Sequence, residues 1–209
     1  MEAFTLALRL GATGLESDVW VTADGVAVLD HDGVTGPRWR RRPIGELART
    51  ELPDHVPTLV ELLDAIDDRV HLSLDLKDAA SGPAVIELLQ DRGEERRTHT
   101  WLCAKDRAAL LPLLGHGVRL LESTRLAKIK EGPERRAADL AAEGVDGINL
   151  RHDDWTGGLA TLFHRFGLVA FGWDVQFEHH LRPALRMGLD AVYSDHVDVM
   201  MDAYRAEFG

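Results

Sequence analysis

The chain has 209 residues, 45% of them hydrophobic, and a formal net charge of −11 at pH 7. This length fits one domain with a sizeable core, spanning residues 1–209. The negative charge argues against nucleic acid or an anionic membrane surface as the main partner, and no apolar run is long enough to span a bilayer. Because Cys103 is the only cysteine, no internal disulfide forms, and a cytoplasmic location is expected.

The chain opens with a predicted helix over residues 2–11. Glu16 and Asp18 follow in a predicted strand, and Asp24-Gly25 predicts a two-residue hairpin loop. In that register Asp18 faces His31, and Glu16 lies on the same face as Asp18. Two carboxylates and an imidazole gathered in this way favour a metal site with a neighbouring acid–base group. A solvated acidic face with a structural histidine is the alternative.

Residues 33–57 are predicted to be irregular. The basic run Arg38-Trp39-Arg40-Arg41-Arg42 in this segment is interpreted as a solvated loop, with a basic lip facing a substrate as the alternative. A helix follows, because Thr58 with Glu61 three residues later forms a capping-box signature.

From residue 71 onward, predicted strands alternate with predicted helices. This order indicates βαβ units around a parallel sheet of about seven strands, one fewer than a (β/α)₈ barrel. An open doubly wound sheet is the alternative, but no Gly-rich phosphate loop follows an early strand. The predicted strands cover 71–77, 98–103, 118–122, 147–150, 168–175 and 191–194, and the predicted helices 82–90, 106–114, 133–143, 159–166 and 179–187.

A barrel also predicts polar residues at the carboxyl ends of its strands. The sequence has such residues at the expected places: Glu16, Asp18, Asp75, Lys77, Glu122, Trp173, Asp174 and Asp195.

Several motifs occur in one order along the chain. They are Leu15-Glu16-Ser17-Asp18-Val19, Asp24-Gly25, His31-Asp32, Val56-Pro57-Thr58-Leu59, Leu74-Asp75-Leu76-Lys77, Gly172-Trp173-Asp174-Val175 and the segment from Gly188 to Asp195. The series resembles the glycerophosphodiester phosphodiesterase family of TIM-barrel enzymes over nearly the whole chain. The resemblance implies hydrolysis of small glycerophosphodiesters to glycerol 3-phosphate and an alcohol, in lipid and glycerol metabolism.

The resemblance also implies roles for individual residues. Glu16, Asp18 and Asp75 match metal ligands for Mg²⁺ or Ca²⁺, although the family more often has Glu at the third position. His31 matches one of two catalytic histidines. Lys77 would help to hold the phosphate, with a strand-end salt bridge as the alternative, and Trp173 matches a tryptophan that flanks the pocket, with rim packing as the alternative.

One departure from the family pattern matters most. The family begins with a strand ending in His-Arg-Gly, followed by Pro-Glu-Asn, whereas this chain starts at Met1-Glu2-Ala3. We therefore expect an α/β, TIM-barrel-like fold that lacks the first strand and the partner histidine, with low turnover. The alternatives are a degenerate or truncated barrel that binds metal or phosphoester without turnover, and a related barrel phospholipase.

Overall fold

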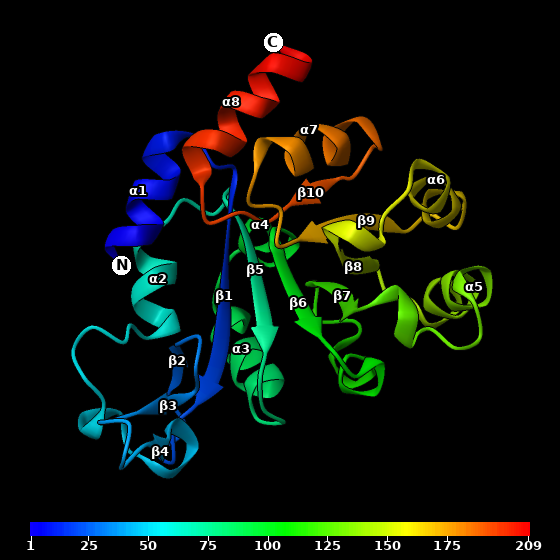
Figure 1. Cartoon of the computed structure of the whole chain (residues 1–209). Helices are drawn as coiled ribbons and strands as arrows, with labels where there is room; N and C mark the ends of the chain where they lie inside the picture. The colour runs from blue at the N-terminus through cyan, green and yellow to red at the C-terminus, as the bar shows by residue number, and fades with distance from the viewer.

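Seven parallel strands form the centre of the computed structural model, which describes residues 1–209 (Figure 1). The sheet order is β10-β9-β8-β7-β6-β5-β1-β2, and only β2 runs antiparallel to its neighbour. The parallel strands are β1 (Gly14–Val21), β5 (His71–Leu76), β6 (Thr100–Ala104), β7 (Arg119–Thr124), β8 (Gly147–Arg151), β9 (Val169–Trp173) and β10 (Ala191–Val192).

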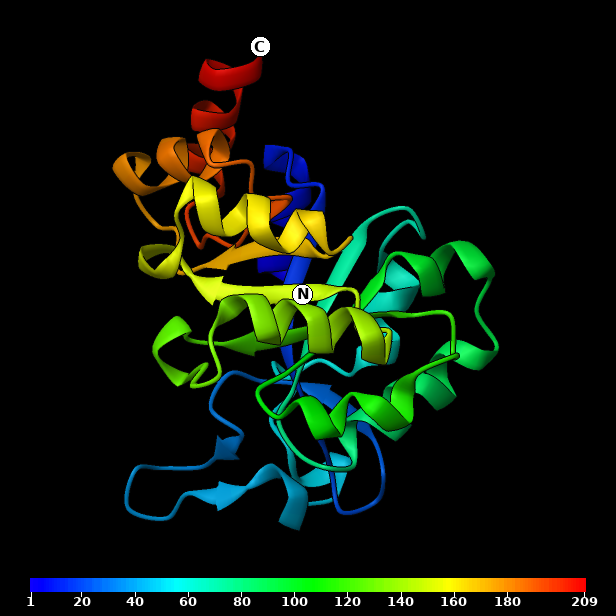
Figure 2. The same ribbon diagram turned by 90° about the vertical axis from the view of Figure 1, so that its right-hand side faces the viewer.

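The α-helices lie around the outside of this sheet (Figures 1 and 2). They are α1 (Glu2–Leu10), α2 (Leu59–Ala65), α3 (Ser81–Gln90), α4 (Glu94–Thr98), α5 (Pro133–Glu143), α6 (Gly157–Arg165), α7 (Glu178–Arg186) and α8 (Val197–Phe208). The smaller elements are β2 (Ala27–Leu29), β3 (Val34–Thr35), β4 (Arg42–Pro43) and the 3₁₀ turns η1 (Ile44–Glu46), η2 (Arg49–Glu51), η3 (Arg107–Ala109), η4 (Leu111–Leu113), η5 (Leu126–Lys128) and η6 (His152–Asp154). No helix combines the length and the apolar character needed to cross a membrane.

The two faces of the sheet pack differently because side chains alternate along each strand. Outward residues such as Leu74, Leu102 and Ile148 join a buried apolar core of 34 residues beneath the helices. The inward face has a much smaller apolar cluster, built on Cys103, Leu121 and Phe171. The sheet therefore has one helix-covered face and one concave inner face that carries polar groups, as in a barrel.

The sheet curls but does not close. β10 and β1 are the outermost parallel strands and do not pair with each other. The hydroxyl of Tyr193, next to β10, nevertheless lies 2.8 Å from that of Ser73 on β5, which shows how strongly the sheet curves. Outside the sheet, α1 packs against α8. The predicted TIM-barrel-like architecture of seven parallel strands with one open side is confirmed.

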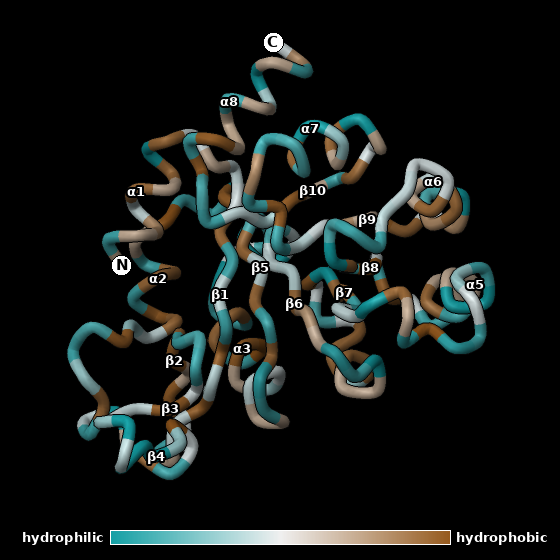
Figure 3. The backbone as a smooth tube through the Cα atoms, in the orientation of Figure 1, coloured by the Kyte–Doolittle hydropathy of each residue, from teal (hydrophilic) through white to brown (hydrophobic).

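Local signals explain several element boundaries. Thr58 caps α2 by accepting a hydrogen bond from the Glu61 amide (3.1 Å), and Glu61 accepts one from the Thr58 amide (2.7 Å), as predicted. α5 ends at Gly144, whose φ of 82° is the left-handed conformation typical of a helix end. The basic run 38–42 is exposed, in the largely hydrophilic loop around β4 (Figure 3).

Two predictions of secondary structure were incomplete. The helix expected over 106–114 is instead the pair of turns η3 and η4, because Pro112 lacks the amide hydrogen that a continuous helix needs. The short helix α4 and the C-terminal helix α8 were not predicted.

Candidate active site

The hairpin that begins the site differs in register from the prediction. Val21 pairs with Ala27, and the Asp30 amide donates to the Asp18 carbonyl at 3.1 Å. Asp18 therefore lies opposite Asp30, and the prediction that it faces His31 across the hairpin was wrong by one residue.

The physical reason is a three-residue loop in place of a two-residue one. The Thr22 amide donates to the Val26 carbonyl at 3.0 Å, leaving Ala23, Asp24 and Gly25 between them. Gly25 has a φ of 83°, the left-handed conformation that closes such a loop with a bulge. The Thr22 hydroxyl donates to Asp24 at 2.6 Å and accepts from the Val26 amide at 2.9 Å, which stabilises the longer loop.

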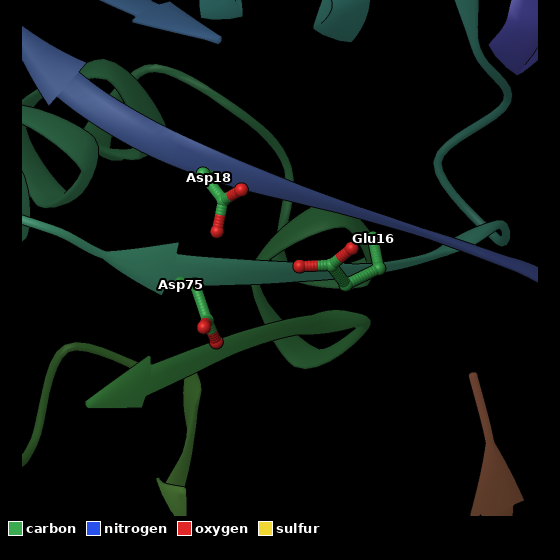
Figure 4. A group of neighbouring side chains, drawn as sticks. All are labelled: Glu16, Asp18 and Asp75. Atoms are coloured by element: carbon green, nitrogen blue, oxygen red, sulfur yellow. The ribbon is translucent and has the colours of Figure 1, made fainter. Parts of the chain in front are cut away.

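Three carboxylates converge on the inner face, at the carboxyl ends of β1 and β5. Asp18 pairs in register with Asp75, and Glu16 lies two residues before Asp18 on the same face. One carboxylate oxygen from each of the three residues lies within 4.8 Å of the other two (Figure 4). The predicted convergence of these residues is present, although their roles as ligands stay a prediction.

The close approach of these carboxylates and their burial raise the pKa of two of them, Glu16 and Asp75. Surrounding protein and the charges of Asp75 and Asp18 raise the pKa of Glu16 to about 8. Water still reaches the Glu16 side chain, because β1 lies at the open side of the sheet. Burial also raises the pKa of Asp75, against the opposing charge of Lys77. Such a group of carboxylates is short of positive charge and favours a cation.

Lys77 supplies part of that charge. Its ammonium lies 2.6 Å from Asp18 and 3.1 Å from Asp75, and its side chain is 23% exposed. Desolvation opposes its charge, but hydrogen bonding and attraction to the two aspartates outweigh this and raise the pKa of Lys77. The predicted neighbourhood of Lys77 and the acidic group is therefore present.

His31 lies at the edge of this group. Its side chain is 93% exposed, and its Nδ1 atom lies 3.0 Å from Asp32. The hydrogen bond with Asp32, followed by the charge of Asp18, raises the pKa of His31. Both Asp18 and Lys77 affect this pKa, so His31 lies within electrostatic reach of the acidic group even though the register differs from the prediction.

Trp173 ends β9 elsewhere on the same rim and does not join the three carboxylates. The guanidinium carbons of Arg125 and Arg151 each lie 6.0 Å from the centre of its ring. The Trp173 Nε1 atom is buried and has no hydrogen-bond partner. The next residue, Asp174, has a φ of 60° and binds Arg151 at 2.7 Å. The indole N–H is thus a buried donor without a partner.

Glu122 and Asp195, two further polar residues near strand ends, differ in whether they lie near the acidic group. Glu122 does not face the site: it is buried on the outer face, where it pairs with Arg136 of α5. Asp195 exchanges hydrogen bonds with Gln176, both at 2.9 Å, and its charge contributes to the raised pKa of Glu16. Glu122 therefore lies in the last half of its strand but does not belong to the site.

The sequence did not indicate that three further residues meet on the inner face: Ser73, Cys103 and Tyr193. Ser73 lies two residues before Asp75 and contacts both Tyr193 (2.8 Å) and the Cys103 sulfur (3.2 Å). The two-residue period of β5 could have identified Ser73, but the contact with Tyr193 depends on the curvature of the whole sheet.

The donor set fits a hard divalent cation. All three groups offer carboxylate oxygen, and no thiolate or imidazole lies among them. The adjacent Lys77 ammonium shows that this position already attracts positive charge. The residues present are therefore chemically suited to a divalent cation that prefers oxygen ligands.

Comparisons with known proteins agree with this geometry. The model of the glycerophosphoryl diester phosphodiesterase family matches residues 1–199. A Mycobacterium tuberculosis protein named "Probable glycerophosphodiester phosphodiesterase 2" is 26% identical over 97% of this chain and 83% of its own length.

Solved structures share the fold. A glycerophosphodiester phosphodiesterase from Thermotoga maritima has a TM-score of 0.81 at 21% identity, covering 96% of this chain and 89% of its own. A phosphodiesterase from Oleispira antarctica, solved with the product sn-glycerol-3-phosphate, has a TM-score of 0.81 at 18% identity, covering 97% and 90%.

Proposed function

This chain belongs to the glycerophosphoryl diester phosphodiesterase family, and we propose that it hydrolyses glycerophosphodiesters to glycerol 3-phosphate and an alcohol. The observation that carries the proposal is the convergence of Glu16, Asp18 and Asp75 beside Lys77 at the carboxyl ends of β1 and β5. Residues 1–209 act as one domain in this proposal. The reaction belongs to lipid and glycerol metabolism and takes place in the cytoplasm, where the free, buried Cys103 stays reduced.

Glu16, Asp18 and Asp75 would hold the metal ion, Mg²⁺ or Ca²⁺. When bound, such an ion supplies Lewis-acid neutralisation of the phosphate charge. Lys77 adds a fixed positive charge beside the same phosphate, and its two aspartate contacts keep it oriented. Trp173 would flank the substrate at the rim, with Arg125 and Arg151 near its ring.

His31 transfers protons in this proposal. In hydrolysis, the oxygen of a water molecule forms a new bond to phosphorus while the bond between phosphorus and the alcohol oxygen breaks. The attacking water loses a proton, and the leaving alcohol oxygen gains one. The exposed imidazole of His31, oriented by Asp32, can exchange a proton with either group. Because the proposal assigns proton transfer to His31 alone, we expect slow turnover from a single proton-transfer group.

The test is release of glycerol 3-phosphate from glycerophosphoethanolamine by the 209-residue protein, with and without Mg²⁺ or Ca²⁺. We expect slow, cation-dependent release that Asp18→Asn abolishes. Release that continues at the same rate without a divalent cation, or in Asp18→Asn, would contradict the proposed site.

A second candidate function is binding without turnover. The open side of the sheet and the dependence of the proposed reaction on His31 alone favour it. Calorimetric binding of the diester with no release of glycerol 3-phosphate over a long incubation would support this alternative over hydrolysis.

A further inference from the structure

Lys105 lies directly after β6, one strand further along the rim from Lys77. Asp75 on β5 pairs in register with Cys103 on β6, and two residues further along each strand stand Lys77 and Lys105. Both lysines therefore continue the inward-facing rows of their strands.

Lys105 differs from the other cations of the rim in lacking a partner. Four lysine or arginine residues lie within two positions of the carboxyl end of a parallel strand: Lys77, Lys105, Arg125 and Arg151. Lys77 binds Asp18 and Asp75, Arg125 binds Asp153 and Asp154, and Arg151 binds Asp153 and Asp174.

Lys105 is exposed, and no carboxylate lies within 4.0 Å of it. The adjacent Asp106 is not available, because its side chain caps η3 by accepting from the Ala108 amide at 3.0 Å. The Lys105 charge is therefore free to meet an anion, in a protein whose net charge is −11.

Its position suggests which part of the substrate it meets. Lys77 already stands between Asp18 and Asp75, beside the place of the scissile phosphate. Neighbouring strands are about 4.8 Å apart, so Lys105 lies about one strand spacing beyond Lys77. A diester whose phosphate lies beside Lys77 would extend its alcohol along the rim toward Lys105.

Resting on the proposed function, we propose that Lys105 selects diesters whose alcohol moiety carries a negative charge. Two substrates test this closely, because glycerophosphoserine is glycerophosphoethanolamine with one added carboxylate. An ion pair between that carboxylate and the ammonium strengthens binding of the serine diester alone. The matched variant is Lys105→Gln, and Lys130→Gln is its control, since Lys130 is an exposed lysine further along the loop after β7.

The experiment measures the dissociation constants of both diesters by calorimetry in the presence of Ca²⁺. Every protein carries His31→Ala, so that the ligands survive the titration. We expect Lys105→Gln to weaken binding of glycerophosphoserine by about three- to tenfold, the range for an exposed to partly desolvated ion pair. Binding of glycerophosphoethanolamine should stay unchanged, and Lys130→Gln should alter neither constant.

Three results would overturn the inference. Equal weakening of both diesters by Lys105→Gln would assign Lys105 to the scissile phosphate. If Lys105→Gln bound both diesters with unchanged dissociation constants, Lys105 would not belong to the site. The proposed function would then still stand. If the His31→Ala protein that retains Lys105 bound neither diester, that result would contradict the proposed function itself.

Discussion

The hydroxyl groups of Ser73 and Tyr193 lie 2.8 Å apart, although 120 residues separate them in the sequence. The contact joins β5 to the segment after β10 across the concave inner face. It lies directly beneath the acidic group, because Ser73 precedes Asp75 by two residues and pairs in register with Glu16. The floor of the site is thus fixed by a link between its two sides.

Removing this link should lower stability by a small, measurable amount. Tyr193→Phe keeps the ring and deletes the hydroxyl, so we expect the free energy of unfolding to fall by about 1 kcal/mol. Urea unfolding measures the change. Tyr204→Phe is the control, because Tyr204 is 49% exposed on α8 and its hydroxyl has no partner. Equal effects of the two substitutions would mean that the contact with Ser73 contributes nothing.

Divalent-cation binding should depend on Asp18. Asp18→Asn keeps the shape of the side chain but removes the charge between Glu16 and Lys77, so calorimetric binding of Mg²⁺ or Ca²⁺ should be lost. Asp202→Asn removes a charge from an exposed position on α8 and should leave binding unchanged. Retained affinity in Asp18→Asn would move the cation site elsewhere.

His31→Ala should impair catalysis without affecting folding. The His31 side chain is 93% exposed, so its removal should leave the melting temperature unchanged. Loss of a positioned proton-transfer group typically lowers the rate by about 10²–10⁴-fold. Initial rates of glycerol 3-phosphate release measure the effect, with His116→Ala as a control at an exposed histidine before β7. A rate within twofold of the original would exclude His31 from catalysis.

The stability of the metal-free protein should fall as pH rises. The pKa of Glu16 is raised from 4.5 to about 8 on folding, so the folded state holds a proton there that the unfolded state releases. Stability from this group is complete below pH 4.5 and is lost as pH rises through 8. Solvent access to Glu16 reduces the size of the effect.

Thermal unfolding between pH 6 and 9 tests this dependence. Glu16→Gln should flatten the profile over this range, because the amide has no proton to lose. Added Ca²⁺ should reverse the trend, because cation binding favours ionised carboxylates. A profile that is identical in the original protein and in Glu16→Gln would show that Glu16 does not titrate as described.

Much of the architecture could be predicted because local patterns and tertiary packing agree. Alternating residues in β5 and the capping box at Thr58 each specify their elements without help from distant segments. The proximity of Glu16, Asp18 and Asp75 also followed from the two-residue period and the parallel order of β1 and β5.

The failures concern features that local patterns do not determine. Asp24-Gly25 fits both a two-residue and a three-residue loop, and the hydroxyl of Thr22 decides between them. Glu122 lies near a strand end like Asp75, but its side chain points to the outer face of the sheet, where it pairs with Arg136 of α5. The Ser73–Tyr193 contact requires the complete curl of the sheet, which no short segment encodes.

The packing of α1 against α8 has a consequence for the order of folding during synthesis. Gly11, at the end of α1, lies against Met201 of α8, and α8 also packs on α7. The seven parallel strands of the sheet are all translated between α1 and α8. Contacts between such distant segments close late and slowly. During translation, the part of α1 that packs on α8 therefore lacks its partner until the strands of the sheet have been made.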